Sequence, residues 1–377
     1  MKLLWALLLK PSPAKAAAQL GDITTGPRPS PAKILSWCVS AFASVTILTA
    51  ALDRPTQVND AAITAEGYPA TLSEYHLFTD LKTRTPAPRV AAYHLNTPLF
   101  SDYAEKQRYL YIPAGKSARY DPDKVLDLPI GAALIKTFGY RQQGTFRPLE
   151  TRLLLHRASG WVAIPYVWNA DGSDAVLKRA GTRIPITFAD PAGRSRTISY
   201  SVPNQNQCKD CHALAGVITP IGPKARNFND GVQLQALVAA GLLDRAPADA
   251  PRLARWDDAT APLADRATAY LETNCAHCHN REGAASNSGL FFGWKEPDPT
   301  ARGILKHPVA AGRGSGDRIY DIDPGHPEDS IILLRMVSTE PGVAMPELGR
   351  ATAHDEALAM LTRWIAGMKP NGSQPYR

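Results

Sequence analysis

Two pentapeptides of the form C-x-x-C-H constrain this chain more than any other feature of its sequence. They occupy residues Cys208–His212 and Cys275–His279. In this pattern two thiols can bond covalently to the vinyl groups of haem, and the adjacent histidine can bind the iron. The sequence therefore predicts two covalently bound haem c groups. The residues concerned are Cys208, Cys211, Cys275 and Cys278 for covalent attachment, and His212 and His279 as axial ligands of the two irons.

Such cysteine pairs have three other uses: a zinc site, a dithiol redox centre and structural disulfides. A zinc ribbon places its two pairs about 15–20 residues apart, and Cys211 is much farther than that from Cys275. A thioredoxin-like dithiol belongs to a βαβ pattern, which we do not find, and it needs no histidine after each pair. Two disulfides remain an alternative in an exported chain.

An apolar stretch near the N-terminus predicts export. Residues Ile34–Leu52 are mostly apolar, Lys33 precedes them and small residues lie near their end, as in a secretory signal. The stretch is also about as long as one membrane span, so 1–53 is expected to be a signal peptide or a membrane anchor. A buried core helix is the remaining alternative. Because bacteria attach haem covalently outside the cytoplasm, we expect a periplasmic protein, either free or held at the inner membrane.

The charge of the chain argues against nucleic acid as a partner. The formal net charge is +7 over 377 residues, but much of it lies in the N-terminal segment, and no basic run with interleaved aromatic residues is present. The 44% of hydrophobic residues suffice for sizeable cores, and the 32 prolines favour many turns over a long helical bundle. Redox proteins are the partners that two haem groups imply.

Short strands separated by turns dominate the first half of the chain. They run from about Val90 to Pro203 and include Glu150–Arg157 and Trp161–Trp168, which Ala158-Ser159-Gly160 separates in the manner of a β-hairpin. Leu72–Leu81 reads as a short helix. Many short strands of this kind predict a sandwich or small barrel.

Helical spacing appears on both sides of the second motif. Ala264–Thr273 leads straight into Cys275, and His354–Gly367 carries apolar residues at helical spacing. Two helices that pack across each other around haem are the frame of a class I cytochrome c.

We therefore expect an α+β multidomain fold, in which a β-rich N-terminal domain precedes a mainly α-helical, cytochrome c-like C-terminal domain. The expected segments are 1–53 as signal peptide or membrane anchor, 54–205 as the β-rich domain, 206–255 as the first haem-attachment segment and 256–369 as the class I-like cytochrome c domain.

Met345 is the best candidate for the second axial ligand of the second haem. It lies in a loop rich in proline and glycine before the last helix, and Pro346 follows it, as in class I cytochromes c. A thioether ligand raises the reduction potential of iron. Met336 is the nearest rival, but its apolar neighbours favour a place in the core. An ordinary loop methionine is the alternative use of Met345.

The first haem has no obvious second ligand. His277 lies between the cysteines of the second motif and is constrained to point elsewhere. An open iron position would admit peroxide, CO or a substrate. Five further histidines are conceivable ligands, although each alone is more typical of a surface or hydrogen-bonded residue: His76, His94, His156, His307 and His326.

Several segments, the two motifs among them, resemble an uncharacterised family of bacterial dihaem c-type cytochromes. The similarity runs from about residue 70 to the C-terminus. It implies a β-rich N-terminal region, two haem groups and a class I-like cytochrome domain, and it implies electron transfer in general terms. The segments that carry it are Asn96–Ala104, Tyr166–Asn169, Asn206–His212, Ile221–Arg226 and Asn274–His279.

Two main functions are compatible with these features. The favoured one is electron transfer between periplasmic redox partners, because no acid–base pair is legible near the motifs. The alternative is a dihaem oxidoreductase, peroxidase-like or substrate-oxidising, whose first haem is open. In a third hypothesis the β domain is a binding or docking module, and the haem groups are its redox reporters.

Overall fold

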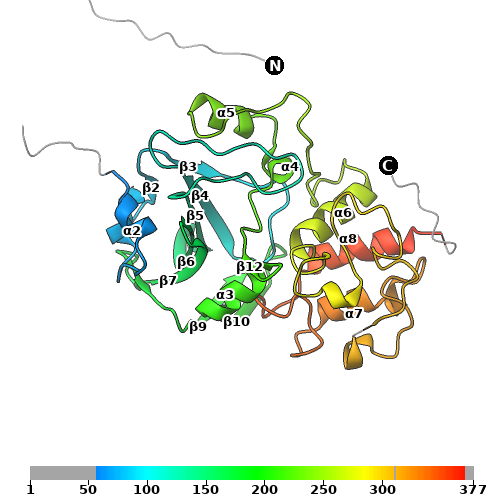
Figure 1. Cartoon of the computed structure of the whole chain (residues 1–377). Coiled ribbons are helices and arrows are strands. Elements are labelled where there is room, and N and C mark those ends of the chain that lie inside the picture. Colours follow the sequence, from blue (N-terminus) through cyan, green and yellow to red (C-terminus); the bar gives the residue numbers. More distant parts are fainter. Residues whose placement is uncertain (1–56, 310, 370–377) are drawn as a thin grey trace, which may run out of the picture. The chain divides into compact units, whose positions relative to one another are not determined.

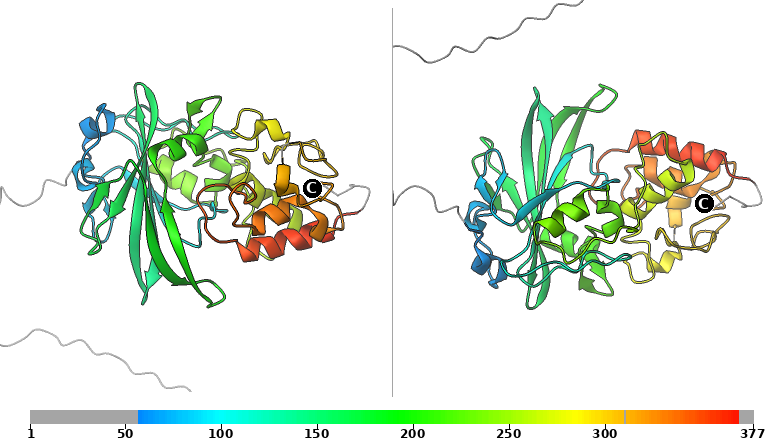
Figure 2. Two further views of the ribbon diagram at one scale, coloured as in Figure 1. Left: turned by 90° about the horizontal axis from the view of Figure 1, so that it is seen from below. Right: turned by 90° about the horizontal axis from the view of Figure 1, so that it is seen from above.

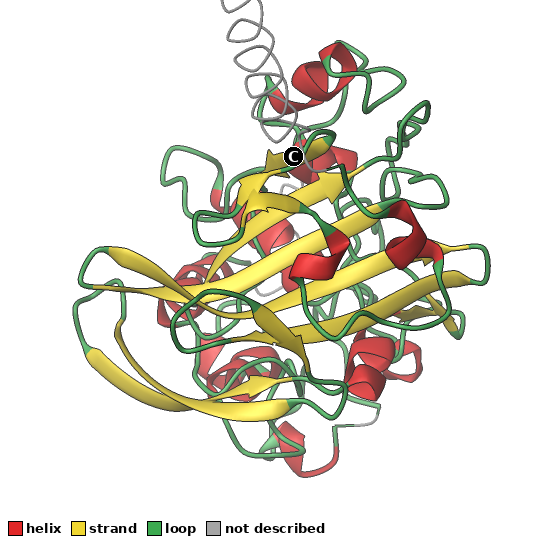
Figure 3. Cartoon of the chain, turned by 90° about the vertical axis from the view of Figure 1, so that its left-hand side faces the viewer, coloured by secondary structure: helices red, strands yellow, loops and turns green. Residues whose placement is uncertain are grey.

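A six-stranded antiparallel sheet forms the centre of the β-rich part of the chain (Figure 1). The computed structural model describes residues 57–309 and 311–369, so the expected signal or anchor over 1–53 lies outside the described residues. Each strand pairs with the next along the chain, and Figure 3 shows them side by side. The prediction of a β-rich N-terminal region is confirmed. The strands are β3 (Val90–Tyr93), β4 (Glu105–Tyr111), β5 (Ala133–Gln142), β6 (Thr145–Arg157), β7 (Gly160–Trp168) and β8 (Ala175–Leu177).

Both faces of this sheet are buried, because different segments of the chain cover them. Along β4, Tyr109 points to one face and Leu110 to the other, as the period of two in a strand requires. Both views in Figure 2 show the N-terminal segment (blue) on one side of the sheet. The other face packs against the loop over 113–132 and against α4 and α5. The covering elements are α2 (Asp60–Thr64), η1 (Ser73–Tyr75), β1 (Phe78–Asp80) and β2 (Thr85–Pro86) on the first face, and α4 (Ala225–Phe228) and α5 (Gln233–Ala239) on the second.

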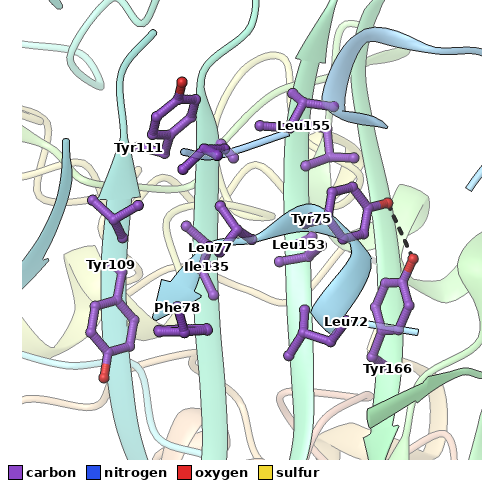
Figure 4. Packing of buried hydrophobic residues seen from close by; sticks show 14 of the residues in the cluster. Leu72, Tyr75, Leu77, Phe78, Tyr109, Tyr111, Ile135, Leu153, Leu155 and Tyr166 are labelled. Atoms are coloured by element: carbon purple, nitrogen blue, oxygen red, sulfur yellow. Dashed lines mark hydrogen bonds between the residues drawn. The ribbon is translucent and has the colours of Figure 1, made fainter. Parts of the chain in front are cut away.

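The N-terminal segment is held to the sheet by buried side chains. In Figure 4, Tyr75 and Leu77 lie among residues of β5, β6 and β7, and the hydroxyl groups of Tyr75 and Tyr166 are 3.1 Å apart. The helix expected over Leu72–Leu81 is wrong. Only Ser73–Tyr75 forms a 3-10 turn there, because a chain that lies flat on a sheet can bury side chains without helical spacing.

A separate antiparallel pair, β9 (Thr182–Ala189) and β10 (Ser195–Val202), packs beside the central sheet. Its Phe188 and Tyr200 form a cluster with Phe138 and Tyr140 of β5. The central sheet does not close, because β3 and β8 are the two ends of its strand order and do not pair with each other. The expected sandwich or small barrel is therefore replaced by an open sheet with a hairpin, since helices and loops cover its faces.

The first motif lies on helix α3 (Gln205–His212), which begins three residues after β10 ends. Asn204 and Gln207 cap the helix reciprocally: the Asn204 side chain accepts from the Gln207 N–H at 2.8 Å, and the Gln207 side chain accepts from the Asn204 N–H at 3.0 Å. The sequence places the motif correctly after the last long strand but does not reveal the helix, because the segment has no apolar periodicity. The short strands β11 (Ala213–Leu214) and β12 (Val217–Ile218) follow.

Helices supply the regular structure of residues 256–369, and long loops join them. The helices expected over Ala264–Thr273 and His354–Gly367 are confirmed as α6 and α8, which pack together around Leu271 and Leu361. Loops make up most of this region, so it is not mainly α-helical by residue. The elements are α6 (Leu263–Asn274), η2 (Ser286–Ser288), η3 (Gly312–Ser315), η4 (Pro327–Asp329), α7 (Ile331–Val337) and α8 (Asp355–Ala366).

A search for membrane spans among the described residues finds no helix of sufficient length and apolar character.

A buried carboxylate joins the β9–β10 pair to the central sheet. Glu150 on β6 is fully buried. It accepts hydrogen bonds from the guanidinium of Arg152 at 2.9 and 2.5 Å and from the hydroxyl of Tyr200 at 2.5 Å. A buried charge is costly unless it is paired and hydrogen-bonded. These three residues therefore fix the end of β10, from which the first motif continues.

Tyr200→Phe is expected to lower the free energy of unfolding by about 1–3 kcal/mol, because it leaves Glu150 without one hydrogen bond in a dry site. Unfolding in denaturant measures the loss. Tyr120→Phe is the matched control, since Tyr120 is also buried and its hydroxyl has no hydrogen bond to a described residue. Equal losses in the two variants would contradict the assignment.

Candidate functional site

The first motif places a neutral imidazole at the end of α3. The Nδ1 of His212 lies 3.1 Å from the carbonyl oxygen of Thr219, so Nδ1 carries the proton and Nε2 keeps a lone pair. Burial, and next the positive charge of Lys136, lower the pKa of His212 to about 3. The ring is therefore uncharged at neutral pH and can bind a metal through Nε2.

The second motif forms a single helical turn directly after α6. The N–H groups of Cys278 and His279 both donate to the carbonyl oxygen of Cys275, at 3.2 and 2.9 Å. The Nδ1 of His279 lies 3.1 Å from the Oγ of Ser288, whose own proton goes to the carbonyl oxygen of Ala285 at 2.6 Å. The serine oxygen must then accept from Nδ1, which again leaves a lone pair on Nε2. Burial, and then the charge of Arg335, lower the pKa of His279 to about 4.

A cavity of about 170 Å³ lies beside the first motif. Cys208, Cys211 and His212 line it on the side of α3, and residues of β4 to β7 line it on the side of the sheet. Apolar side chains such as Leu134 and Leu154 alternate there with basic ones. This mixture suits a largely apolar ligand that carries anionic groups.

Three basic residues stand in one row across the sheet at this cavity. Arg108 on β4 is in register with Lys136 on β5, and Lys136 is in register with Arg152 on β6. Side chains that face each other across two strands lie about 4.5–5.5 Å apart at Cβ, and like charges repel there. All three line the cavity. We call these three residues the cation row.

Two of the three residues in the cation row have no anionic partner among the described residues. Arg152 pairs with Glu150, whereas no described carboxylate pairs with Arg108 or Lys136. The Nε of Arg108 is buried and has no hydrogen-bond partner in the described part of the chain. Burial, and next the charges of Arg108 and Arg152, lower the pKa of Lys136 to about 7. An anionic group in this cavity would relieve the repulsion and satisfy the unpaired donors.

A second cavity, of about 410 Å³, lies beside the second motif. Cys275, Cys278, His279 and Met345 all line it. The remaining wall is mainly apolar and includes Leu290, Phe292, Ile322, Ile332 and Met336. The structure thus brings the sequence-predicted Met345 to the same cavity as His279, although the two are far apart in the sequence.

The backbone at Met345 is held by a half-buried arginine. The guanidinium of Arg350 donates to the carbonyl oxygens of Arg335, Ser338 and Met345 at 3.0, 2.7 and 2.8 Å. The N–H of Met345 donates to the same Arg335 oxygen at 2.8 Å. Five hydrogen-bonding groups therefore converge on one place, and they fix the loop that presents the thioether.

The two cavities share part of their walls. The residues common to both are Phe100, Cys211, His277, Pro346 and Leu348. Phe100 is held from two sides: its N–H donates to the Oδ1 of Asn274 at 2.7 Å, and its ring stacks on His354 with centroids 4.2 Å apart. The two motifs therefore face adjoining spaces, not separate ones.

The four motif cysteines are thiols without disulfides. Burial raises the pKa of Cys208 and Cys278 to about 11 and that of Cys275 to about 12. Reactive dithiols have lowered pKa values, whereas burial shifts the pKa of these thiols in the opposite direction. The four cysteines also form no group with metal-ligand spacing: in the described ranges that spacing occurs at the exposed set His326, Glu328 and Asp329.

The other sequence candidates lie elsewhere. None of the five histidines considered for the first site lines either cavity. His94 pairs with Asp230 at 2.9 Å, and His156 stacks on Trp161 while its Nδ1 contacts the carbonyl oxygen of Leu128 at 2.8 Å. His277, by contrast, lines both cavities.

Sequence reasoning missed the residues that the sheet contributes. A signal was available only for Arg108 and Arg152, which are basic residues inside apolar strand patterns. Lys136 belongs to a strand that the sequence did not reveal, and His354 contacts Phe100 only through the tertiary fold.

Comparison of the chain with family models, with curated proteins and with solved structures finds no match in any of the three.

Arg350→Gln is expected to loosen the Met345 loop, because hydrogen bonds from a charged donor contribute about 1.5–3 kcal/mol. Amide hydrogen exchange at Met345 should accelerate while exchange in α6 stays unchanged. Arg363→Gln is the control, since Arg363 is exposed on α8. Unchanged exchange at Met345 in the Arg350 variant would contradict this role.

Proposed function

We propose that this chain is an exported dihaem c-type cytochrome that transfers electrons between periplasmic redox partners. The observation that carries the proposal is that each C-x-x-C-H motif lines its own cavity and that the two cavities adjoin. Each motif also presents a neutral histidine whose Nε2 is free. The resemblance to bacterial dihaem cytochromes supports the same function.

The first cavity fits a haem c in three respects. Cys208 and Cys211 would hold the vinyl groups through thioether bonds, and His212 would bind the iron. The cation row would pair with the propionate groups, which supply the anions that Arg108 and Lys136 lack. Apolar residues of the sheet would cover the ring and keep water out.

The second cavity fits a haem c with a different ligand set. Cys275 and Cys278 would provide the thioether bonds, His279 one axial ligand and Met345 the other. The helices α6 and α8 pack together beside this cavity, in support of a class I-like cytochrome c domain over 256–369. The Ser288 hydroxyl and the Arg350 guanidinium would hold His279 and Met345 in place.

Bound haem c supplies a one-electron iron couple whose potential depends on the axial ligands and on burial. Met345 would raise the potential at the second site, whereas the cation row and its anions would set the potential at the first. Unequal potentials give the electron a direction. Phe100, Pro346 and Leu348 form an apolar wall between the sites, so no water layer has to separate two groups bound there.

Export is proposed from the apolar stretch Ile34–Leu52, either as a cleaved signal or as an anchor at the inner membrane. The proposed partners are redox proteins, and nucleic acid is not among them. Titratable side chains at the two cavities are committed to one another, as Lys224 is to Glu272 and Tyr270 to His354, which favours a carrier over a dihaem oxidoreductase.

The exported wild-type protein is expected to carry two covalently bound haem groups, measured as pyridine haemochrome per chain. The double variant Cys208→Ser, Cys211→Ser should retain one, and so should Cys275→Ser, Cys278→Ser. Cys38→Ser, which alters the one cysteine outside the motifs, should retain two. A wild-type chain exported by cells that mature c-type cytochromes, yet carrying no haem, would contradict the proposal.

Met345→Ala is expected to leave one coordination position of the second iron vacant, because a methyl group cannot replace the thioether as a ligand. The reduced wild type should bind no CO, and the variant should bind CO at half of its haem, as its absorption difference spectrum shows. Met336→Ala is the control, since Met336 lines the same cavity but belongs to the apolar core. CO binding by the wild type, with turnover of peroxide, would favour the oxidoreductase instead.

A further inference from the structure

We propose that His277 is the second axial ligand of the first haem, opposite His212, so that the second motif supplies a ligand to the haem of the first. The inference rests on the proposed function, because it requires a haem on Cys208 and Cys211. It goes beyond that function in two ways. It assigns a ligand to the open coordination position of the first iron, and it links the two sites through one turn of the chain.

His277 cannot serve the iron of its own motif. Residues 275–279 form one helical turn, in which successive side chains are about 100° apart. His277 therefore leaves the turn on roughly the opposite side from both Cys275 and His279. Its neighbour Ala276 is buried in the core between the helices, and His277 itself lines the first cavity as well as the second.

The imidazole of His277 has no hydrogen-bond partner among the described residues at its buried nitrogen. Its Nδ1 is buried and makes no hydrogen bond within the described residues. Buried polar atoms without a partner are uncommon, and an ordered water or a bound ion can satisfy them. His212 and His279 differ in this respect, since each has its Nδ1 paired.

Histidine is the best donor that the first cavity contains. His212 and His277 are the two histidines among its lining residues, and no methionine lines it. The two come from opposite parts of the chain: His212 ends α3, whereas His277 follows α6. Two imidazoles on separate elements, both lining one cavity, are the arrangement that two axial ligands need.

Of the two lysines that line this cavity, one pairs with a carboxylate and the other is assigned to a propionate. The Nζ of Lys224 donates to the buried carboxylate of Glu272 at 2.6 Å. Lys136 stands in the cation row between Arg108 and Arg152. An ammonium that pairs with a propionate keeps its proton, and it then has no lone pair for iron. His277 is neither paired with a carboxylate nor assigned to a propionate.

If His277 fills the open coordination position of the first iron, the first haem would be an electron carrier and not a reaction centre. This ligation would also couple the two sites, because one turn would hold ligands or covalent bonds to both haem groups. His277, Cys278 and His279 are consecutive, so a shift of the turn at one site would displace a ligand at the other.

The test begins with the wild-type holoprotein. Near-infrared magnetic circular dichroism of the oxidised protein distinguishes bis-histidine, histidine–methionine and histidine–lysine ligation. We expect one bis-histidine haem and one histidine–methionine haem. A histidine–lysine signal, or a high-spin first haem, would overturn the inference, while a count of two haem groups would leave the proposed function standing.

Three variants assign the ligand to a residue. His277→Ala should open one iron, so that CO binding rises from none to half of the haem, and added imidazole should reverse this. His277→Met, which keeps a ligating atom, should convert the bis-histidine signal to a second histidine–methionine signal. His94→Met is the control, since His94 lines neither cavity, and it should leave both signals unchanged.

All three variants keep the C-x-x-C-H pattern, so each should retain two haem groups. A His277→Met protein that retains the bis-histidine signal would overturn the inference, and so would loss of that signal in His94→Met. Absence of haem from the wild type would instead contradict the proposed function itself.

Discussion

Repulsion within the cation row is the constraint on which the site depends. Arg108, Lys136 and Arg152 stand side by side on a covered face of the sheet, where like charges are costly. The fold relieves part of this cost through Glu150, which Tyr200 supports from β10. Because α3 continues from β10, the same network places the first motif over the row. The remaining positive charge makes the cavity complementary to a ligand with carboxylates.

The adjoining cavities bring two motifs that are far apart in the sequence to neighbouring spaces. Phe100, Pro346 and Leu348 form an apolar wall between them, and His277 reaches both. Histidines with paired Nδ1 atoms stand at each motif, whereas the Nδ1 of His277 is unpaired. This difference in hydrogen bonding distinguishes His212 and His279 from His277.

Local patterns in the sequence predicted the motifs, the hairpin between β6 and β7, and the helices α6 and α8, because each of these depends on residues close in the chain. The open sheet was not predicted, because a sheet closes into a barrel only if its two edge strands pair, and the sequence does not show whether they do. The cation row was missed because strand register brings together residues of three strands. Met345 was found through its Pro-rich loop, whereas the role inferred for His277 required the shared wall, which only tertiary packing creates.

Mass spectrometry of chymotryptic peptides from the exported protein tests the central claim most directly, since it locates any modification of the four motif cysteines. Neither motif contains a phenylalanine, tyrosine, tryptophan or leucine, so each pair of cysteines stays within one peptide. The account predicts that the peptide with Cys208 and Cys211 and the peptide with Cys275 and Cys278 each carry one haem through thioether bonds. Unmodified thiols in both peptides, or a disulfide within either, would contradict it.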